Sequence, residues 1–101
     1  MAEPKKERFR RVRGAILKLL AHEHPKPVDC KVLHFLLDDL GYTIDEEECS
    51  SHISYLEEKG YIKIEKRKGG GVRIKMITIS APGLDLLDDF GKKDPGVDVR
   101  F

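Results

Sequence analysis

The sequence has little cysteine and no long apolar run, and each absence excludes a class of protein. Cys30 and Cys49 are the two cysteines among 101 residues. Their spacing indicates no disulfide framework, so we expect buried free thiols. No apolar stretch approaches the roughly 20 residues that a membrane-spanning helix needs. The start, MAEPKKERFRR, lacks the apolar segment of a secretory signal, so we expect a cytoplasmic protein without a membrane partner.

Catalytic and metal-binding patterns are also missing. The chain has no glycine-rich phosphate loop followed by Lys and Ser or Thr, and no nucleophile elbow. The three glycines at 69–71 do not open a helix, so they do not form a nucleotide loop. The histidines and cysteines have no spacing that makes four ligands converge on one metal ion. We therefore predict no enzyme activity, no cofactor and no metal.

The formal net charge is only +1, but the charges are segregated along the chain. Residues 5–18 contain seven Lys or Arg and one acid, and residues 63–75 contain six Lys or Arg and one acid. Between them, residues 28–58 contain nine Asp or Glu and one cation, Lys31. Segregation of this kind carries information about binding partners rather than about the fold.

Apolar spacing predicts two helices in the first 40 residues. From Phe9 to Leu20 apolar residues recur every three or four positions, which is typical of an amphipathic helix. Prolines 25 and 27 then end it. Asp29 can cap a second helix that stops at Gly41. The apolar stripe expected for this second helix consists of Val32, Leu33, Leu36, Leu37 and Leu40.

A third helix is predicted between Asp45 and Gly60. Asp45 with Glu48 three residues later fits a capping box, and acids favour the N-terminal end of a helix. The residues expected to face the core are Cys49, Ile53 and Leu56.

From residue 61 onwards the apolar period changes from about 3.6 to 2. Residues 61–65 and 72–76 alternate between apolar and charged side chains, which predicts two strands. The intervening KRKGGG is expected to be a hairpin loop that is longer and looser than a two-residue turn. Because Met76 and Ile77 are both apolar, a bulge or a strand buried on both sides is expected there.

Ser80 is expected to cap a short fourth helix with Leu84, Leu87 and Phe90 on its apolar side. The order helix, helix, helix, hairpin, helix predicts an α+β fold of the winged helix-turn-helix type, with a three-helix bundle, a β-hairpin wing and a short C-terminal helix. Val28 would supply the short strand that joins the hairpin. The predicted organisation is a basic N-terminal arm (1–8), a winged-helix domain (9–91, wing at about 61–79) and a C-terminal tail (92–101).

Several segments resemble known winged-helix proteins. YLEEKGYIKIE at 55–65 and ITISAPGLDLL at 77–87 resemble the end of the third helix and the stretch after the wing in bacterial winged-helix regulators. RGAILKLL, LLDDLGYTI, YLEEKGYIKIE, GGGVRIKMITISAPGLDLL and DPGV occur in the same order as in small winged-helix proteins of Mu-like prophages. The resemblance covers residues 13–97 and implies a winged-helix fold, a phage-derived setting and no enzyme activity. The dense basic arm and the acidic run 45–48 depart from that pattern.

The basic segments predict a protein that binds double-stranded DNA, as a transcriptional regulator would. The wing would enter a minor groove or follow the backbone, and the arm would contact phosphates beside it. The outward residues of the third helix would be its readers of base edges. The predicted nucleic-acid-binding residues are Arg8, Arg10, Arg11, Arg13, Ser50, Ser51, Ser54, Tyr55, Lys66, Arg67, Lys68, Arg73 and Lys75.

Two observations keep alternatives open. Acids at the start of the third helix repel phosphate, and the chain has no Asn or Gln, the usual bidentate readers of adenine. One alternative is therefore a phage-derived adaptor that uses this fold to bind a protein partner without binding DNA. A homodimer through the first and fourth helices is a further expectation. A third reading treats the clustered cations as solvated surface charges.

Overall fold

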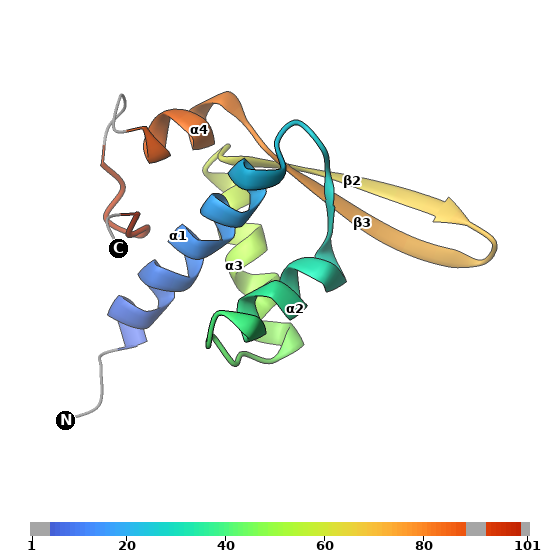
Figure 1. Ribbon diagram of the computed structural model, residues 1–101, viewed down its shortest axis with the longest axis horizontal. Coiled ribbons are helices and arrows are strands. Elements are labelled where there is room, and N and C mark those ends of the chain that lie inside the picture. The colour runs from blue at the N-terminus through green and yellow to red at the C-terminus, as the bar shows by residue number, and fades with distance from the viewer. Residues whose placement is uncertain (1–4, 89–92, 100–101) are drawn as a thin grey trace.

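The second and third helices pack against a central first helix. The computed structural model describes residues 5–88 and 93–99. Helix α1 spans Lys5–Glu23, α2 spans Cys30–Asp39 and α3 spans Glu46–Glu58 (Figure 1). α1 contacts both other helices because its apolar stripe reaches towards each of them. The fully buried large side chains of the core include Val12, Ile16, Leu17, Leu20, Leu33, Leu37, Leu56 and Ile77.

The predicted helix caps are confirmed. The Asp29 carboxylate accepts from the Lys31 backbone N–H at 2.8 Å, and the Asp45 carboxylate accepts from the Glu48 backbone N–H at 2.7 Å. Each bond satisfies a donor that the first turn of a helix leaves without an intrahelical partner. Ser80 caps α4, which spans Ala81–Leu87. Phe90, which was expected to extend the apolar side of this helix, lies outside the described residues.

The strands form one antiparallel sheet in the order β1-β3-β2. β1 is Val28–Asp29, β2 is Ile62–Gly69 and β3 is Val72–Ile79. Val28 pairs with Ile77, as expected for the short strand that joins the hairpin. The pairing of β2 with β3 runs without interruption from Ile62 with Ile79 to Gly69 with Val72. There is therefore no bulge at residues 76 and 77, where Ile77 is buried and Met76 is half-buried.

The hairpin turn is tighter than predicted. Gly70 and Gly71 are the two turn residues, with φ of 56° and 78°, and Gly69 and Val72 still pair across the strands. Two consecutive positive φ angles suit a primed two-residue turn, whose twist matches that of the strands and which favours glycine. Most of KRKGGG is therefore strand, and the expectation of a long loose loop was wrong. As a result the wing is a fully paired β-hairpin that projects beyond the helices (Figure 1).

The predicted apolar stripe of α2 is buried on one side only. Leu33 and Leu37 are fully buried, whereas Val32 is 48% exposed and Leu40 is 56% exposed. Phe35, which was not assigned to the stripe, is 74% exposed. The apolar residues of α2 occupy more of its circumference than α1 and the sheet can cover, so spacing alone assigned too many of them to the core.

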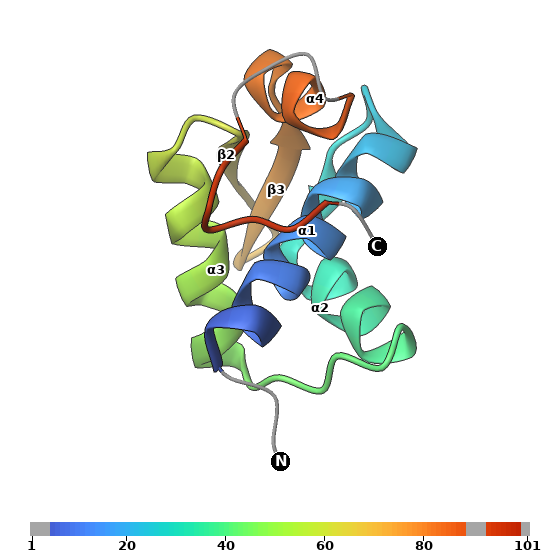
Figure 2. The same cartoon turned by 90° about the vertical axis from the view of Figure 1, so that its left-hand side faces the viewer.

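Both chain ends differ from the predicted arm and tail. α1 begins at Lys5, so residues 5–8 form its first turn. The segment 93–99 crosses α1 beside α3, as Figure 2 shows. Its Val97 is 5% exposed, and the Asp98 backbone N–H donates to the Arg10 carbonyl at 2.9 Å. Irregular segments carry no periodic signal, so only the packing shows that this one belongs to the core. Within the described residues no helix is long and apolar enough to cross a membrane.

Gly96 generates the first testable prediction. A Cβ at this position would overlap the Tyr55 hydroxyl. The substitution Gly96→Ala should therefore displace segment 93–99 from its packed position against Tyr55. We expect a loss of about 1–3 kcal/mol in the free energy of unfolding, as for other overpacked sites, measured by urea titration. Gly69→Ala is the matched control, because a Cβ at Gly69 meets nothing within 4 Å. Equal stability of the two variants would contradict close packing of this segment.

Candidate nucleic-acid interface

The hairpin has two faces of different character, and the pairing register decides which residues share each face. Successive side chains of a strand point to opposite faces, and directly paired residues share one. The face that contains the buried residues Ile62, Ile77 and Ile79 is called the inner face here, and the opposite one the outer face. Towards the tip the inner face continues as Lys66, Lys68, Arg73 and Lys75.

The four inner-face cations form two like-charged pairs. Lys66 pairs directly with Lys75, and Lys68 pairs directly with Arg73. Like charges that stand directly opposite each other destabilise a sheet, by about 0.2–1 kcal/mol for each pair. The inner face of the two strands carries no acid, and none of the four cations forms an ion pair with a described residue. A polyanion bound there would relieve this repulsion.

The base of the wing and α3 enclose a groove of about 540 Å³. Lys66 and Lys75 line it from the wing, and Ser50, Ser54 and Glu57 line it from α3. The two serines are exposed and lie one helical turn apart, so both are on the side of α3 that lines the groove. We call this feature the wing–α3 groove. It brings together two predicted readers and two predicted phosphate-binding cations.

Three residues on these elements differ from expectation. Ser51 is exposed but does not line the groove. Arg67 lies on the outer face, where its Nε donates to Glu65 Oε1 at 3.1 Å. Glu57 was missed as a site residue, although its spacing of three from Ser54 and seven from Ser50 placed it on the same side of a helix.

The arginines at the start of α1 stand away from the wing. Arg8 Nη1 is 3.3 Å from Glu48 Oε1, and Arg10 Nη1 is 3.1 Å from Glu7 Oε1. Arg11 is exposed. This end of α1 and the wing tip lie at opposite ends of the molecule (Figure 1). The arm therefore does not lie beside the wing as predicted, and Arg8 and Arg10 make contacts within the fold.

Arg13 is at the centre of a polar network between α1, α3 and segment 93–99. Its Nε donates to His52 Nδ1 at 3.1 Å, its Nη1 donates to the Gly96 carbonyl at 3.3 Å, and its guanidinium lies 3.7 Å from the centre of the Tyr55 ring. A guanidinium can only donate, so Nδ1 must accept and the imidazole proton is on Nε2, which donates to Glu48 Oε2 at 3.1 Å. Burial lowers the pKa of His52 and nearby Arg13 adds to this, against the opposing effect of Glu48.

Tyr55 is held within the fold instead of facing a ligand. Its hydroxyl donates to Asp94 Oδ1 at 3.2 Å, and the Tyr61 hydroxyl donates to Asp94 Oδ2 at 2.6 Å. Burial opposes ionisation of Asp94, but hydrogen bonds from Tyr61 and from the Gly96 N–H outweigh it and lower the pKa of Asp94. Burial and this carboxylate raise the pKa of Tyr61 to about 12. An ionised Asp94 therefore anchors segment 93–99 to α3 and to the base of the wing.

Burial disfavours the thiolate form of both cysteines. Cys30 lines the wing–α3 groove, and burial raises its pKa, with Lys75 acting in the opposite direction. Burial raises the pKa of Cys49 to about 11. Both cysteines are free, as expected, but only Cys49 is buried, whereas Cys30 is half-buried because it lines the groove. In the described ranges 5–88 and 93–99, no group of three or more His, Cys, Asp or Glu side chains is placed to hold a metal ion.

Solved structures share this architecture. A proposed transcriptional regulator from Thermoplasma acidophilum superposes with a TM-score of 0.65 and 18% identity, over 80% of this chain and 75% of that one. A PadR-family transcriptional regulator from Eggerthella lenta superposes with a TM-score of 0.63 and 24% identity, over 78% of this chain and 70% of that one. No protein-family profile and no curated protein matches the sequence. The matches confirm the predicted winged-helix fold.

The network around His52 predicts a loss of stability in weak acid. Because the pKa of His52 is lowered in the folded protein, the unfolded chain binds a proton at higher pH than the folded one. The neutral imidazole contributes fully above the unfolded pKa of about 6.5, and its contribution is lost as the pH falls below that value. We expect the free energy of unfolding to decrease from about pH 7 to about pH 5, by at most about 1.4 kcal/mol per pH unit for this proton.

Urea titrations across this range test the effect, with His52→Gln as the variant that cannot titrate. Its profile should be flatter than that of the parent, whereas exposed His22→Gln should keep the parent slope. A parent slope retained in His52→Gln would show that another group titrates.

Proposed function

We propose that this protein binds double-stranded DNA as a winged-helix transcriptional regulator, and that the inner face of its wing contacts the phosphates. The observation that carries the proposal is the set of four cations on that face, which has two like-charged pairs and no acid. Both structural neighbours are described as regulators of transcription, the first as a proposed one, which supports the same role. The proposed activity is binding, without catalysis or a cofactor.

In the wing–α3 groove, the wing and α3 would make different kinds of contact with DNA. Phosphate contacts from the wing supply most of the affinity, and this part is insensitive to sequence. Ser50 and Ser54 can donate to or accept from base edges, and the Glu57 carboxylate can accept from a cytosine amino group. Glu57 also repels phosphate, so α3 adds discrimination at some cost in affinity. Ser51 and Arg11, both exposed, are secondary candidates for phosphate contacts.

The remaining predicted contacts have weaker support. Arg8, Arg10, Arg13 and Tyr55 would each have to leave a hydrogen bond or ion pair within the fold before binding a phosphate. Arg67 is on the outer face and is paired with an acid of the same strand. We therefore propose that the inner-face cations, rather than the arm, account for phosphate binding.

Two double variants of the wing test this assignment at equal net charge. Lys66→Ala with Lys68→Ala removes two inner-face cations, and Lys63→Ala with Arg67→Ala removes two outer-face cations. In anisotropy titrations against a random-sequence duplex, four phosphate contacts give a slope of log K on log salt of about −3.6. The inner variant should reduce the magnitude of the slope by about 2. The outer variant should stay close to the parent.

Equal losses in the two variants would show that net charge, not the inner face, governs binding. If the parent itself fails to bind the duplex at low salt, the proposed function is wrong. All four positions are exposed, so the variants should unfold at nearly the same temperature as the parent.

For Glu57 we predict that substitution raises the affinity for DNA, whereas substitution of the inner-face cations lowers it. Glu57→Gln removes a negative charge from the groove, so affinity for a random-sequence duplex should rise by roughly fivefold, since one unit interaction near 4 Å in water is worth about 1 kcal/mol. Neighbouring Glu58→Gln changes the net charge equally but does not line the groove, and it should have a smaller effect. If the two variants bind equally, Glu57 does not face the DNA.

The same proposal includes a Mu-like prophage setting, a cytoplasmic location and a homodimer through α1 and α4. The setting rests on the sequence resemblance alone. The dimer is supported by Leu19 of α1 and by Leu84 and Leu87 of α4, which are only half-buried in one chain. A monomeric mass by light scattering at the concentrations of the DNA titration would refute the dimer.

A further inference from the structure

The side of α2 that α1 does not cover presents an apolar surface to solvent. Val32, Phe35 and Leu40 are 48%, 74% and 56% exposed, and we call them the α2 patch. The spacing of three between Val32 and Phe35 puts them on the same side of the helix, with half-buried Leu36 next to Val32. Leu40, the C-cap residue of α2, lies five positions after Phe35 and therefore at the flank of this surface. Large exposed apolar side chains gathered on one surface are typical of an interaction site rather than of isolated surface residues.

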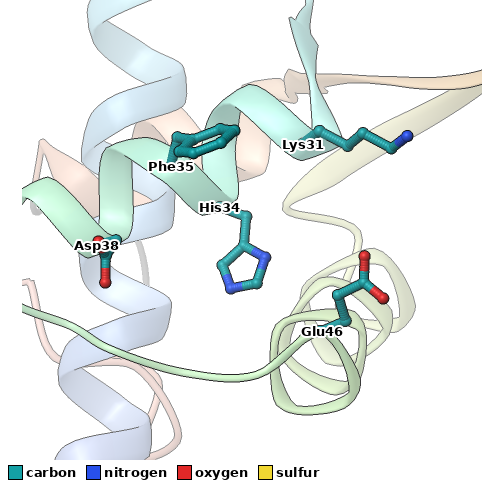
Figure 3. A pocket seen from close by; sticks show the side chains of 5 residues that line it. All are labelled: Lys31, His34, Phe35, Asp38 and Glu46. Carbon is teal, nitrogen blue, oxygen red and sulfur yellow. The ribbon is translucent and has the colours of Figure 1, made fainter.

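A hollow of about 460 Å³ lies beside the patch, between α2 and the first turn of α3. Phe35 lines it together with Lys31, His34, Asp38 and Glu46 (Figure 3). His34 Nε2 is 2.6 Å from the Ile44 carbonyl, so the imidazole donates to the backbone and has a fixed position in the wall. The hollow thus has an aromatic wall and a charged rim, which suits an apolar side chain with a polar group nearby.

The rim is acidic, and this limits what can dock. Asp38 and Glu46 line the hollow, and Asp39 lies one turn from Phe35 on the same side of α2. Lys31 is the only Lys or Arg between residues 28 and 58. Carboxylates beside exposed apolar groups repel a phosphate backbone, so this surface does not suit a nucleic acid. A partner that carries Lys or Arg around apolar residues would be complementary in both respects.

A second copy of this chain is a poor occupant. A two-fold contact through the same surface would bring two acidic rims, each with Asp38, Asp39 and Glu46, into one interface, and like charges brought together oppose association. A head-to-tail contact would need another exposed apolar surface. Among the described residues, the only other large exposed hydrophobic side chain is Val72 beside the wing turn.

We propose that the α2 patch docks a basic amphipathic helix of another protein. One apolar side chain of that helix would enter the hollow beside Phe35, and another, one turn away, would cover Val32. Its Lys or Arg residues would pair with Asp38, Asp39 and Glu46 at the rim. Helices bind apolar grooves through anchors at such spacings, and charges around the anchors set orientation and partner choice.

This docking does not depend on the proposed DNA binding. None of the three patch residues lines the wing–α3 groove. The wing variant Lys66→Ala with Lys68→Ala should therefore bind the same helix as the parent. The two proposals can fail separately.

The test is a selection from a phage-displayed library of helical peptides, with apolar residues fixed at helical spacing and all other positions random. The bait is the full chain. The selected peptides should be enriched in Lys and Arg over Asp and Glu. Their affinity should fall at least tenfold on the variant Phe35→Ser. Val72→Ser is the matched control, since Val72 is 52% exposed on a different element, and it should bind as the parent does.

The peptide selection would overturn the proposal with any of three results: no peptide whose binding requires Phe35, enrichment of acidic peptides, or equal losses in the two serine variants. Light scattering tests the remaining alternative, in which a second copy of this chain binds the patch. If the parent is a dimer and Phe35→Ser is a monomer, the patch belongs to a second copy and the proposal is wrong. Thermal unfolding of both variants confirms that each is folded, as expected for substitutions of exposed residues.

Discussion

The pairing register of the β2–β3 hairpin is the constraint on which the binding surface depends. A shift of one residue in a strand moves every side chain to the opposite face. Two features hold the register: the Gly70–Gly71 turn at the tip and the buried isoleucines Ile62, Ile77 and Ile79 at the base. Because the base is anchored in the core, the outer half of the ladder keeps the same faces beyond it. The core thereby determines which cations of the wing face α3.

The arginines of α1 are clustered like the cations of the wing, but some of them make contacts within the fold. Arg8 and Arg13 join α1 to α3 through Glu48 and His52, and Arg13 also reaches the Gly96 carbonyl. The buried His52 imidazole is tolerated because the half-buried Arg13 guanidinium and Glu48 carboxylate are its hydrogen-bond partners. Asp94, between two tyrosines, holds segment 93–99 across the same helices. Arg8 and Arg13 therefore contribute to folding, whereas the inner-face cations of the wing form no ion pair with a described residue.

The two proposed surfaces have opposite chemistry and lie on different elements. The wing presents cations without acids on one face, which suits phosphate. The α2 patch presents apolar side chains with an acidic rim, which suits a basic helix. Under the two proposals, the basic block of the wing and the acidic block of residues 28–58 would each face a partner of opposite sign. Both surfaces depend on α1, which buries the other side of α2 and packs against α3 and β3.

The sequence by itself determined the element types, the caps at Asp29, Asp45 and Ser80, the short strand at Val28 and the winged-helix order, because periodicity and capping are local properties. It also assigned Ser50, Ser54, Lys66 and Lys75 to the predicted DNA-binding set, and these four residues line the wing–α3 groove. Only the tertiary structure decided that Arg67 is on the outer face, that Glu57 enters the groove and that Tyr55 is held by Asp94. It likewise decided that Phe35 stays exposed and that segment 93–99 packs on the core. These outcomes depend on contacts between residues far apart in the chain, and no local spacing contains that information.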